Sequence, residues 1–372
     1  MVPSSGARRA GLAAAAAAIP VVLAYRFARV YRVRAGYPRR HELVWTPDAL
    51  GMAYEEVAIP TRDGLELPGW YMPAGDGSAT GGTAAPGVVV VHGWESARDR
   101  TLPHAQFLHA AGFHVLAIEV RGHGVNQPET LPISVGEFAA DATAGVRWLA
   151  ARGEVTTIGL LGHSMGAAGV LVAAAAEPRV GAVVGVSTPA DPYRLTRQTF
   201  RLADLPIPGP IAWPLAWLTT RVYLRPRGHS VDDVSAARAV REIAAPVLLV
   251  HGDEDHVVPV GHLARLASIR RAARPDAVTQ TLVVHEGHHS WLFEFPAFRS
   301  TVARFLAASL GGPGDPDTAA RAAEAVPAAR LPEPERLTAL DDEPGGVRSL
   351  LRLVRRHTPT TSTDVPAQEA CP

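Results

Sequence analysis

The stretch "IGLLGHSMGAAGV" (residues 158–170) joins an apolar, strand-like run to a run of small helix-forming residues. Ser164 stands at the junction, with Gly162 and Gly166 two positions away on either side. These residues match the pattern G-x-S-x-G, in which a sharp strand-to-helix turn exposes the serine hydroxyl and the glycines let neighbouring backbone approach closely. The stretch predicts either a serine presented as a nucleophile or an ordinary turn between a strand and a helix.

The segments on both sides of this stretch alternate between strand-like and helical patterns. The runs 54–60 and 65–72 flank Arg62-Asp63-Gly64, and Asp-Gly is a hairpin signal. Later strand-like runs are nearly continuous in apolar residues, as in parallel strands covered on both faces: 87–93, 113–120, 155–164, 180–187, 246–252 and 279–289. Helical patterns lie between and after them, at 101–111, 134–151, 165–176, 258–273 and 297–310. This order predicts an α/β domain with right-handed crossovers.

Polar side chains follow the ends of these predicted strands, where ligands bind in parallel α/β sheets. The set comprises His92, Glu119, Ser164, Asp253 or Asp255, and His289. A serine nucleophile needs a base and an acid that orients the base. Acids after the next-to-last strand and histidines after the last strand give the chain order serine, acid, histidine.

The sequence resembles an α/β-hydrolase over residues 53–310. It is most similar to bacterial serine hydrolases, of the esterase or S33-peptidase kind, that carry an N-terminal hydrophobic segment and a small cap. The motifs "VVVVHGW", "RGHG", "GHSMG", "HGDEDHVVP" and "GHHSW" occur in the family order. The resemblance implies a mostly parallel eight-stranded sheet with helices on both faces. It also implies a hydrolase domain over 41–310, with its cap at about 189–243.

The resemblance assigns a catalytic triad of Ser164, Asp255 and His289. Asp255 occupies the acid position of the family pattern H-G-x-x-D-x-x-V-P, and Asp253 is the alternative acid. His289 occupies the base position two residues after Gly287, and the extra histidine at 288 departs from the commoner residue there. His288 is therefore the alternative base.

The same resemblance assigns the oxyanion hole to the backbone N–H groups of Trp94 and Met165. The predicted cap contains Trp213 and Trp217, and Trp291 follows the predicted base. These three tryptophans are predicted to line the substrate pocket. For the cap, an apolar lid, contact with a membrane surface and packing of its aromatic residues on one another all fit the sequence.

Both ends of the chain differ from the hydrolase region. Residues 10–25 form an uncharged, alanine-rich run within an arginine-rich segment, 1–40. We expect a membrane anchor or transmembrane helix there, with the catalytic domain in the cytoplasm, because the arginines that follow favour retention. A signal peptide of a secreted protein and an alanine-rich soluble helix are the alternatives. Residues 311–372 are predicted to be a disordered tail that includes a basic helical segment at 347–356.

Composition limits the functions that the chain can have. The 372 residues are 47% hydrophobic and carry no formal net charge, which gives no reason to expect nucleic acid as a partner. The single cysteine excludes a disulfide framework within the chain. We expect no cofactor and no metal, although His285, His288 and His289 with Asp253 and Asp255 form an alternative ligand set.

The predicted function is hydrolysis of a carboxylic ester in a small-molecule acyl substrate. Aminopeptidase, amidase, thioesterase or lysophospholipase activity on the same triad is the alternative, followed by a non-catalytic binding protein of the same fold. Neither the substrate nor the oligomeric state follows from the sequence.

Overall fold

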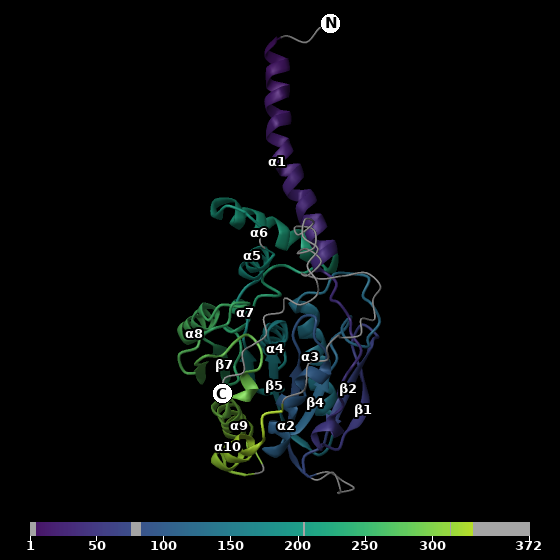
Figure 1. The fold of residues 1–372 in the computed structure, drawn as a ribbon, viewed down its shortest axis with the longest axis vertical. Coiled ribbons are helices and arrows are strands. Elements are labelled where there is room, and N and C mark those ends of the chain that lie inside the picture. Colours follow the sequence, from purple (N-terminus) through teal and green to yellow (C-terminus); the bar gives the residue numbers. More distant parts are fainter. Residues whose placement is uncertain (1–4, 76–82, 204, 313, 330–372) are drawn as a thin grey trace, which may run out of the picture.

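Eight strands form one sheet in the computed structural model, which describes residues 5–75, 83–203, 205–312 and 314–329, with side chains from residue 18 onward (Figure 1). Their spatial order is β1-β2-β4-β3-β5-β6-β7-β8. The strands are β1 (Glu55–Pro60), β2 (Glu66–Met72), β3 (Ala85–Val91), β4 (His114–Ile118), β5 (Val155–His163), β6 (Val180–Val186), β7 (Val247–Gly252) and β8 (Thr279–Val284). β1 and β2 pair antiparallel, β2 pairs antiparallel with β4, and all later pairs are parallel. The predicted α/β architecture is confirmed.

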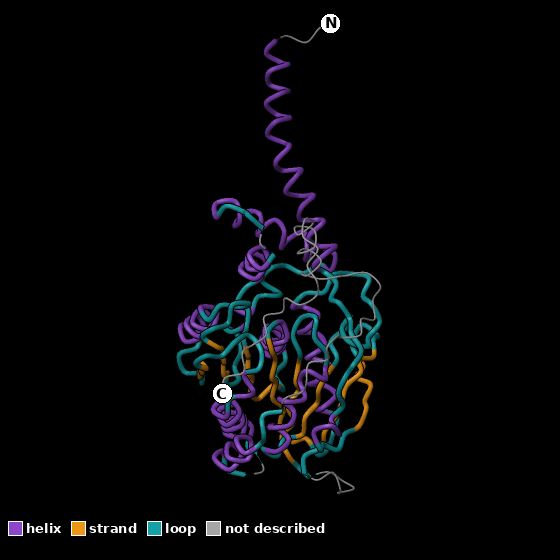
Figure 2. The backbone as a smooth tube through the Cα atoms, viewed as in Figure 1, coloured by secondary structure: helices purple, strands orange, loops and turns teal. Residues whose placement is uncertain are grey.

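The central strands are buried on both faces because helices cover each side of the sheet (Figure 2). One hydrophobic core joins the sheet to α3 (Val135–Ala150), α4 (Met165–Ala176), α7 (Ala236–Ala239) and α8 (Gly261–Ala273). A second core joins the opposite face to α2 (Leu102–Ala110), α9 (Pro296–Leu310) and α10 (Pro316–Ala325). Side chains alternate between the faces along each strand, so that Val89 and Val91 enter the first core and Val88 and Val90 enter the second.

The cap lies between β6 and β7, at the end of the molecule from which α1 (Ser5–Ala35) extends (Figure 1). It contains α5 (Pro192–Leu202), α6 (Gly209–Leu224), the short helix η3 (Arg225–Arg227) and α7. The C-terminal half of α1 packs against α5 and α6: the rings of Phe27 and Phe200 contact edge to face, and the buried Tyr31 hydroxyl lies 2.7 Å from that of Thr199. α1 is therefore attached to the cap.

The prediction of a membrane-spanning helix over residues 10–25 gains no support from the structure. These residues belong to α1. Within the described part of the chain, no helix combines the length and the apolar character needed to cross a membrane. Arginines at positions 26, 29, 32 and 34 place charge in every turn of the helix after the apolar run.

The prediction that everything from residue 311 onward is a disordered tail is wrong for its first part. Asp315 caps α10 by accepting hydrogen bonds from the N–H groups of Asp317 and Thr318. Ala319, Ala320 and Ala323 lie buried on one face of this helix and pack toward α9. Alanine has no long side chain to hold two helices apart, so a sequence poor in large apolar residues still buries a face. The segment 347–356 lies outside the described residues.

We predict that Ala323→Arg lowers the free energy of unfolding by about 2 kcal/mol or more, because an unpaired charge would be buried between α9 and α10. The matched variant Ala325→Arg, at an exposed position of the same helix, should change it by less than about 0.5 kcal/mol. Chemical denaturation of both variants measures the difference. Equal stabilities would contradict the packing of α10.

Candidate active site

Ser164 occupies a sharp turn between β5 and α4. Its backbone has φ 53° and ψ −117°, a conformation that side-chain-bearing residues rarely adopt, and its N–H donates to the Val186 carbonyl at 2.9 Å. A Cβ atom added to Gly162 would lie 2.4 Å from the Gly166 carbonyl oxygen, and one added to Gly166 would lie 2.3 Å from that of His92. Both neighbours are backbone atoms that no rotamer change can move away. Only glycine fits at either position.

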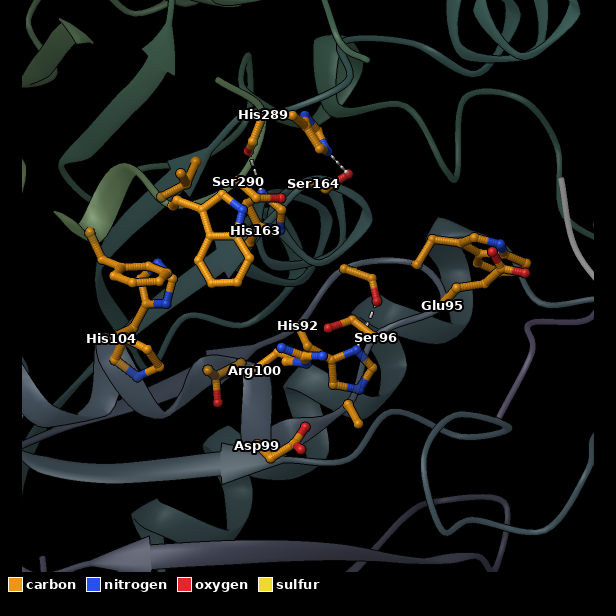
Figure 3. Close-up of a pocket in the computed structure, with 18 of the residues that line it drawn as sticks. His92, Glu95, Ser96, Asp99, Arg100, His104, His163, Ser164, His289 and Ser290 are labelled. Atoms are coloured by element: carbon orange, nitrogen blue, oxygen red, sulfur yellow. Dashed lines mark hydrogen bonds between the residues drawn. The ribbon is translucent and has the colours of Figure 1, made fainter. Parts of the chain in front are cut away.

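His289 connects Ser164 to a carboxylate, and Figure 3 shows its ring beside the Ser164 hydroxyl. Its Nε2 lies 3.0 Å from Ser164 Oγ, and its Nδ1 lies 2.8 Å from Asp255 Oδ2. A carboxylate only accepts hydrogen bonds, so Nδ1 carries the proton and Nε2 of the neutral ring is free to accept from the serine hydroxyl. The structure thus brings the three predicted residues into one hydrogen-bonded chain.

Asp255 is buried and held by several hydrogen-bond donors. Its Oδ1 accepts from the N–H groups of Val257 and Val258, at 2.9 and 2.7 Å, and His251 Nε2 lies 3.2 Å from its Oδ2. Burial alone would raise the pKa of Asp255, but hydrogen bonds from His251 and His289 outweigh burial and hold that pKa below its usual range. The carboxylate is therefore ionised at neutral pH.

The alternative acid and base lie elsewhere. Asp253 accepts from His285 at 2.8 Å on the surface, and His288 Nδ1 lies 3.8 Å from a Glu254 carboxylate oxygen, also on the surface. The residues of the alternative metal site thus fall into separate histidine–carboxylate pairs. Among the described residues, no cluster of three or more histidine, cysteine or acidic side chains is arranged to hold a metal ion.

Two further side chains fix the backbone of His289, and neither was predicted as a site residue. His163 Nε2 donates to the His289 carbonyl at 2.8 Å, and Ser187 Oγ donates to the same oxygen at 3.1 Å. Burial is the main cause that lowers the pKa of His163 to about 3, and the charge of the nearby His289 is the second cause. The His163 ring is therefore neutral. Ser187 follows β6 directly, and the rule that sites gather at the carboxyl ends of strands could have identified it.

The two residues assigned to the oxyanion hole come from different segments of the chain. Met165 is the first residue of α4, where a backbone N–H has no partner within the helix. Trp94 lies in the loop after β3, and its ring packs edge to face on His123 at 5.3 Å between centroids. Both residues follow the carboxyl ends of neighbouring parallel strands, β5 and β3.

The histidines of the "HGW" and "RGHG" motifs are buried and brace these loops. His92 Nδ1 donates to the Gly93 carbonyl at 2.8 Å, and its Nε2 accepts from the Val120 N–H at 3.1 Å. His123 Nδ1 donates to the Arg121 carbonyl at 3.0 Å. Burial holds the pKa of His123 well below its usual value. Neither ring contacts Ser164 through a hydrogen bond among the described residues.

Ser164 and His289 open into a cavity of about 330 Å³ (Figure 3). Val186, Trp291 and Phe293 supply apolar lining. Arg100 of η2 (Arg98–Thr101) and His104 of α2 also line the cavity. Part of the lining, His41 and Glu42, comes from the segment before β1, for which the sequence offered no signal.

Of the three tryptophans predicted to line the pocket, the structure places only Trp291 there. Trp213 and Trp217 lie on α6 with 41% and 51% of their surfaces exposed, and they are not part of the described lining. The prediction assumed that the cap folds over the site, whereas α6 packs on α1 and turns both indole rings outward.

Known proteins resemble this chain in both sequence and structure. A family model described as "Serine aminopeptidase, S33" matches residues 83–224. The uncharacterized protein Rv2307c of Mycobacterium tuberculosis is 30% identical over 258 residues, which cover 68% of this chain and 79% of the relative. The Pyrococcus furiosus esterase Pf2001 is similar in structure, with a TM-score of 0.58 and 25% identity over 75% of this chain and 100% of its own.

A puromycin-hydrolyzing peptidase of Mycobacterium tuberculosis shares the fold, with a TM-score of 0.57 and 19% identity over 71% of this chain and 40% of its own. The sheet order, the serine turn after β5 and these similarities agree with one another. The chain belongs to the α/β-hydrolase superfamily.

Proposed function

We propose that the protein is a serine hydrolase that cleaves a carboxylic ester in a small-molecule acyl substrate. One observation carries the proposal: Ser164 Oγ, the His289 ring and the Asp255 carboxylate form a hydrogen-bonded chain whose serine end opens into a cavity. A binding protein has no need for a serine in an unfavourable backbone conformation with a base at hydrogen-bond distance.

The proposed reaction begins when Ser164 Oγ attacks the substrate carbonyl carbon while His289 Nε2 takes the hydroxyl proton. The negative charge that forms on the carbonyl oxygen is stabilised by the N–H groups of Met165 and Trp94. His289 then protonates the leaving alcohol as the carbon–oxygen bond breaks, which leaves an acyl group on Ser164. Water, deprotonated by the same ring, then attacks the acyl carbon; the bond to Ser164 Oγ breaks as this oxygen takes the proton back from His289, and the acid is released.

Asp255 acts through His289 in this proposal. Its ionised carboxylate fixes the ring with Nδ1 protonated and stabilises the positive charge that the ring carries after taking the serine proton. His163 and Ser187 hold the carbonyl of His289 from the other side. The base is thus positioned through both its ring and its backbone.

The ester assignment is supported by the similarity to the esterase from Pyrococcus furiosus, whose full length is matched by part of this chain. Hydrolysis of an amide, as in an aminopeptidase, is the second candidate, supported by the S33 family match and by the similarity to a peptidase. The triad serves both reactions, because they differ in the leaving group that His289 must protonate.

We expect Ser164→Ala to lower kcat for p-nitrophenyl butanoate by about 10⁵-fold or more, since no other group in the proposal forms the acyl intermediate. Ser290 also lines the cavity and is the matched control, and Ser290→Ala should retain activity within about tenfold. Steady-state kinetics on folded variants measures both. A loss confined to Ser290→Ala would overturn the assignment of the nucleophile.

The acid side of the pH profile of kcat/KM should follow a single ionisation. The two groups that hold His289 should add no second ionisation to this profile. Asp255, with its pKa below the usual range, stays ionised, and His163, with its pKa at about 3, stays neutral. The slope of log kcat/KM against pH should therefore not exceed one above about pH 4.5, and a slope of two there would show a second essential group.

Substrate preference separates the two candidate activities. The cavity is at the small end of the range for ligand sites, so kcat/KM should be higher for p-nitrophenyl butanoate or hexanoate than for the laurate ester. Alanine p-nitroanilide tests the peptidase alternative. Faster cleavage of this anilide than of any of the esters would replace the ester assignment with the amide one and leave the triad assignment unchanged.

A further inference from the structure

The end of the molecule formed by α1, α5 and α6 concentrates exposed apolar side chains. Eleven of the 18 large hydrophobic side chains exposed in the described residues lie on these helices. They are Ile19, Val21, Val22, Leu23, Tyr25, Val30 and Val33 on α1, Leu202 on α5, and Ile211, Trp213 and Trp217 on α6. An accumulation of this kind marks an interaction surface, because scattered exposure is the normal pattern.

The same end is strongly basic in sequence. The chain has no acidic residue before Glu42, and Asp204 is the only one between positions 192 and 231. Arginines are frequent in both segments, at positions 26, 29, 32, 34, 39 and 40 and at positions 194, 197, 201, 221, 225 and 227. The chain as a whole carries no formal net charge, so these two segments carry an excess of positive charge that the rest of the chain balances.

Positive charge and exposed indole rings lie against each other on the cap. The Arg221 guanidinium lies 3.9 Å from the centre of the Trp217 ring, and the Arg197 guanidinium lies 4.6 Å from that of Trp213. Burial and the neighbouring charges of Arg201 and Arg194 lower the pKa of Arg197. The Asp191 carboxylate already pairs with Arg194 at 3.2 Å, and a further anionic partner would relieve the repulsion that remains among these cations.

The helices that carry these residues form one unit. Phe27 and Tyr31 of α1 pack on Phe200 of α5 with ring centroids 5.6 and 5.8 Å apart, and Arg32 donates to the Val222 carbonyl of α6 at 3.3 Å. Figure 1 shows α1 extending away from the hydrolase domain at the place where α5 and α6 cover it. The exposed apolar part of α1 and the tryptophans of α6 therefore belong to the same end of the molecule.

We propose that this end docks on the surface of a lipid bilayer that contains anionic phospholipids. Tryptophan is the residue that best suits the boundary between headgroups and acyl chains, and arginine pairs with lipid phosphates. Apolar burial and charge attraction then act together, as in helices that lie on membranes without crossing them. A second copy of this chain is a poorer occupant, because it would bring the same positive charge to the interface.

The test is co-sedimentation of the full-length protein with vesicles of phosphatidylcholine, with or without about 30% phosphatidylglycerol. Binding should require the anionic lipid and weaken strongly between about 0.05 M and about 0.5 M salt. The triple variant Arg197→Gln/Arg201→Gln/Arg221→Gln should lower the vesicle partition coefficient on the order of 100-fold, since each arginine near an anionic surface raises this coefficient several-fold. Trp213→Ala/Trp217→Ala should weaken it about tenfold or more.

The matched control is Arg62→Gln/Arg238→Gln/Arg271→Gln, which removes three exposed arginines from elsewhere on the molecule. This variant should bind vesicles within about threefold of the unmodified protein. Melting temperature and hydrolysis of a water-soluble ester verify that each variant is folded. Equal binding to both kinds of vesicle, or equal loss in both triple variants, would overturn the proposal. So would a lipid-independent dimer that dissociates in Trp213→Ala/Trp217→Ala.

Discussion

The contact between backbone atoms at Gly162 and Gly166 is the constraint on which the site depends. The first turn of α4 approaches the end of β3 so closely that the Cβ of any other residue at 166 would lie 2.5 Å from the Val91 carbonyl oxygen. This proximity forces Ser164 into its unfavourable backbone conformation and places its hydroxyl above the carboxyl ends of the strands. The Ser164 N–H is bonded to the Val186 carbonyl, so neighbouring strands hold the turn in place.

A second close approach places the acid and base loops together. A Cβ on Gly252 would lie 2.0 Å from the Gly287 carbonyl oxygen, so the loops that carry Asp255 and His289 meet through bare backbone. The Glu254 N–H donates to that Gly287 carbonyl at 3.0 Å. Catalytic groups must be held to within a fraction of an ångström, and backbone contacts vary less than contacts between flexible side chains.

The sequence predicted the sheet well because its buried strands appear as continuous apolar runs that end in polar residues. It also predicted which residues meet at the site, because Ser164, Asp255 and His289 each follow a strand and match a family motif. The side chains that hold His289 by its carbonyl were not predicted. Ser187 follows a strand and could have been found by the same rule, whereas the hydrogen bond from His163 to backbone leaves no pattern in the chain. The prediction that Trp213 and Trp217 of the cap line the pocket was wrong for a related reason. Two tryptophans four residues apart indicate an apolar face of a helix, but they do not say whether that face turns toward the cavity or toward solvent.

In the proposed mechanism, Ser164 carries the acyl group during turnover. The most direct measurement is mass spectrometry of protein quenched within milliseconds of mixing with p-nitrophenyl butanoate. We expect a butanoyl adduct on the peptide that contains Ser164, formed faster in the unmodified protein than in His289→Ala. Turnover with no adduct at Ser164, or an adduct on another residue that forms at the rate of turnover, would contradict it.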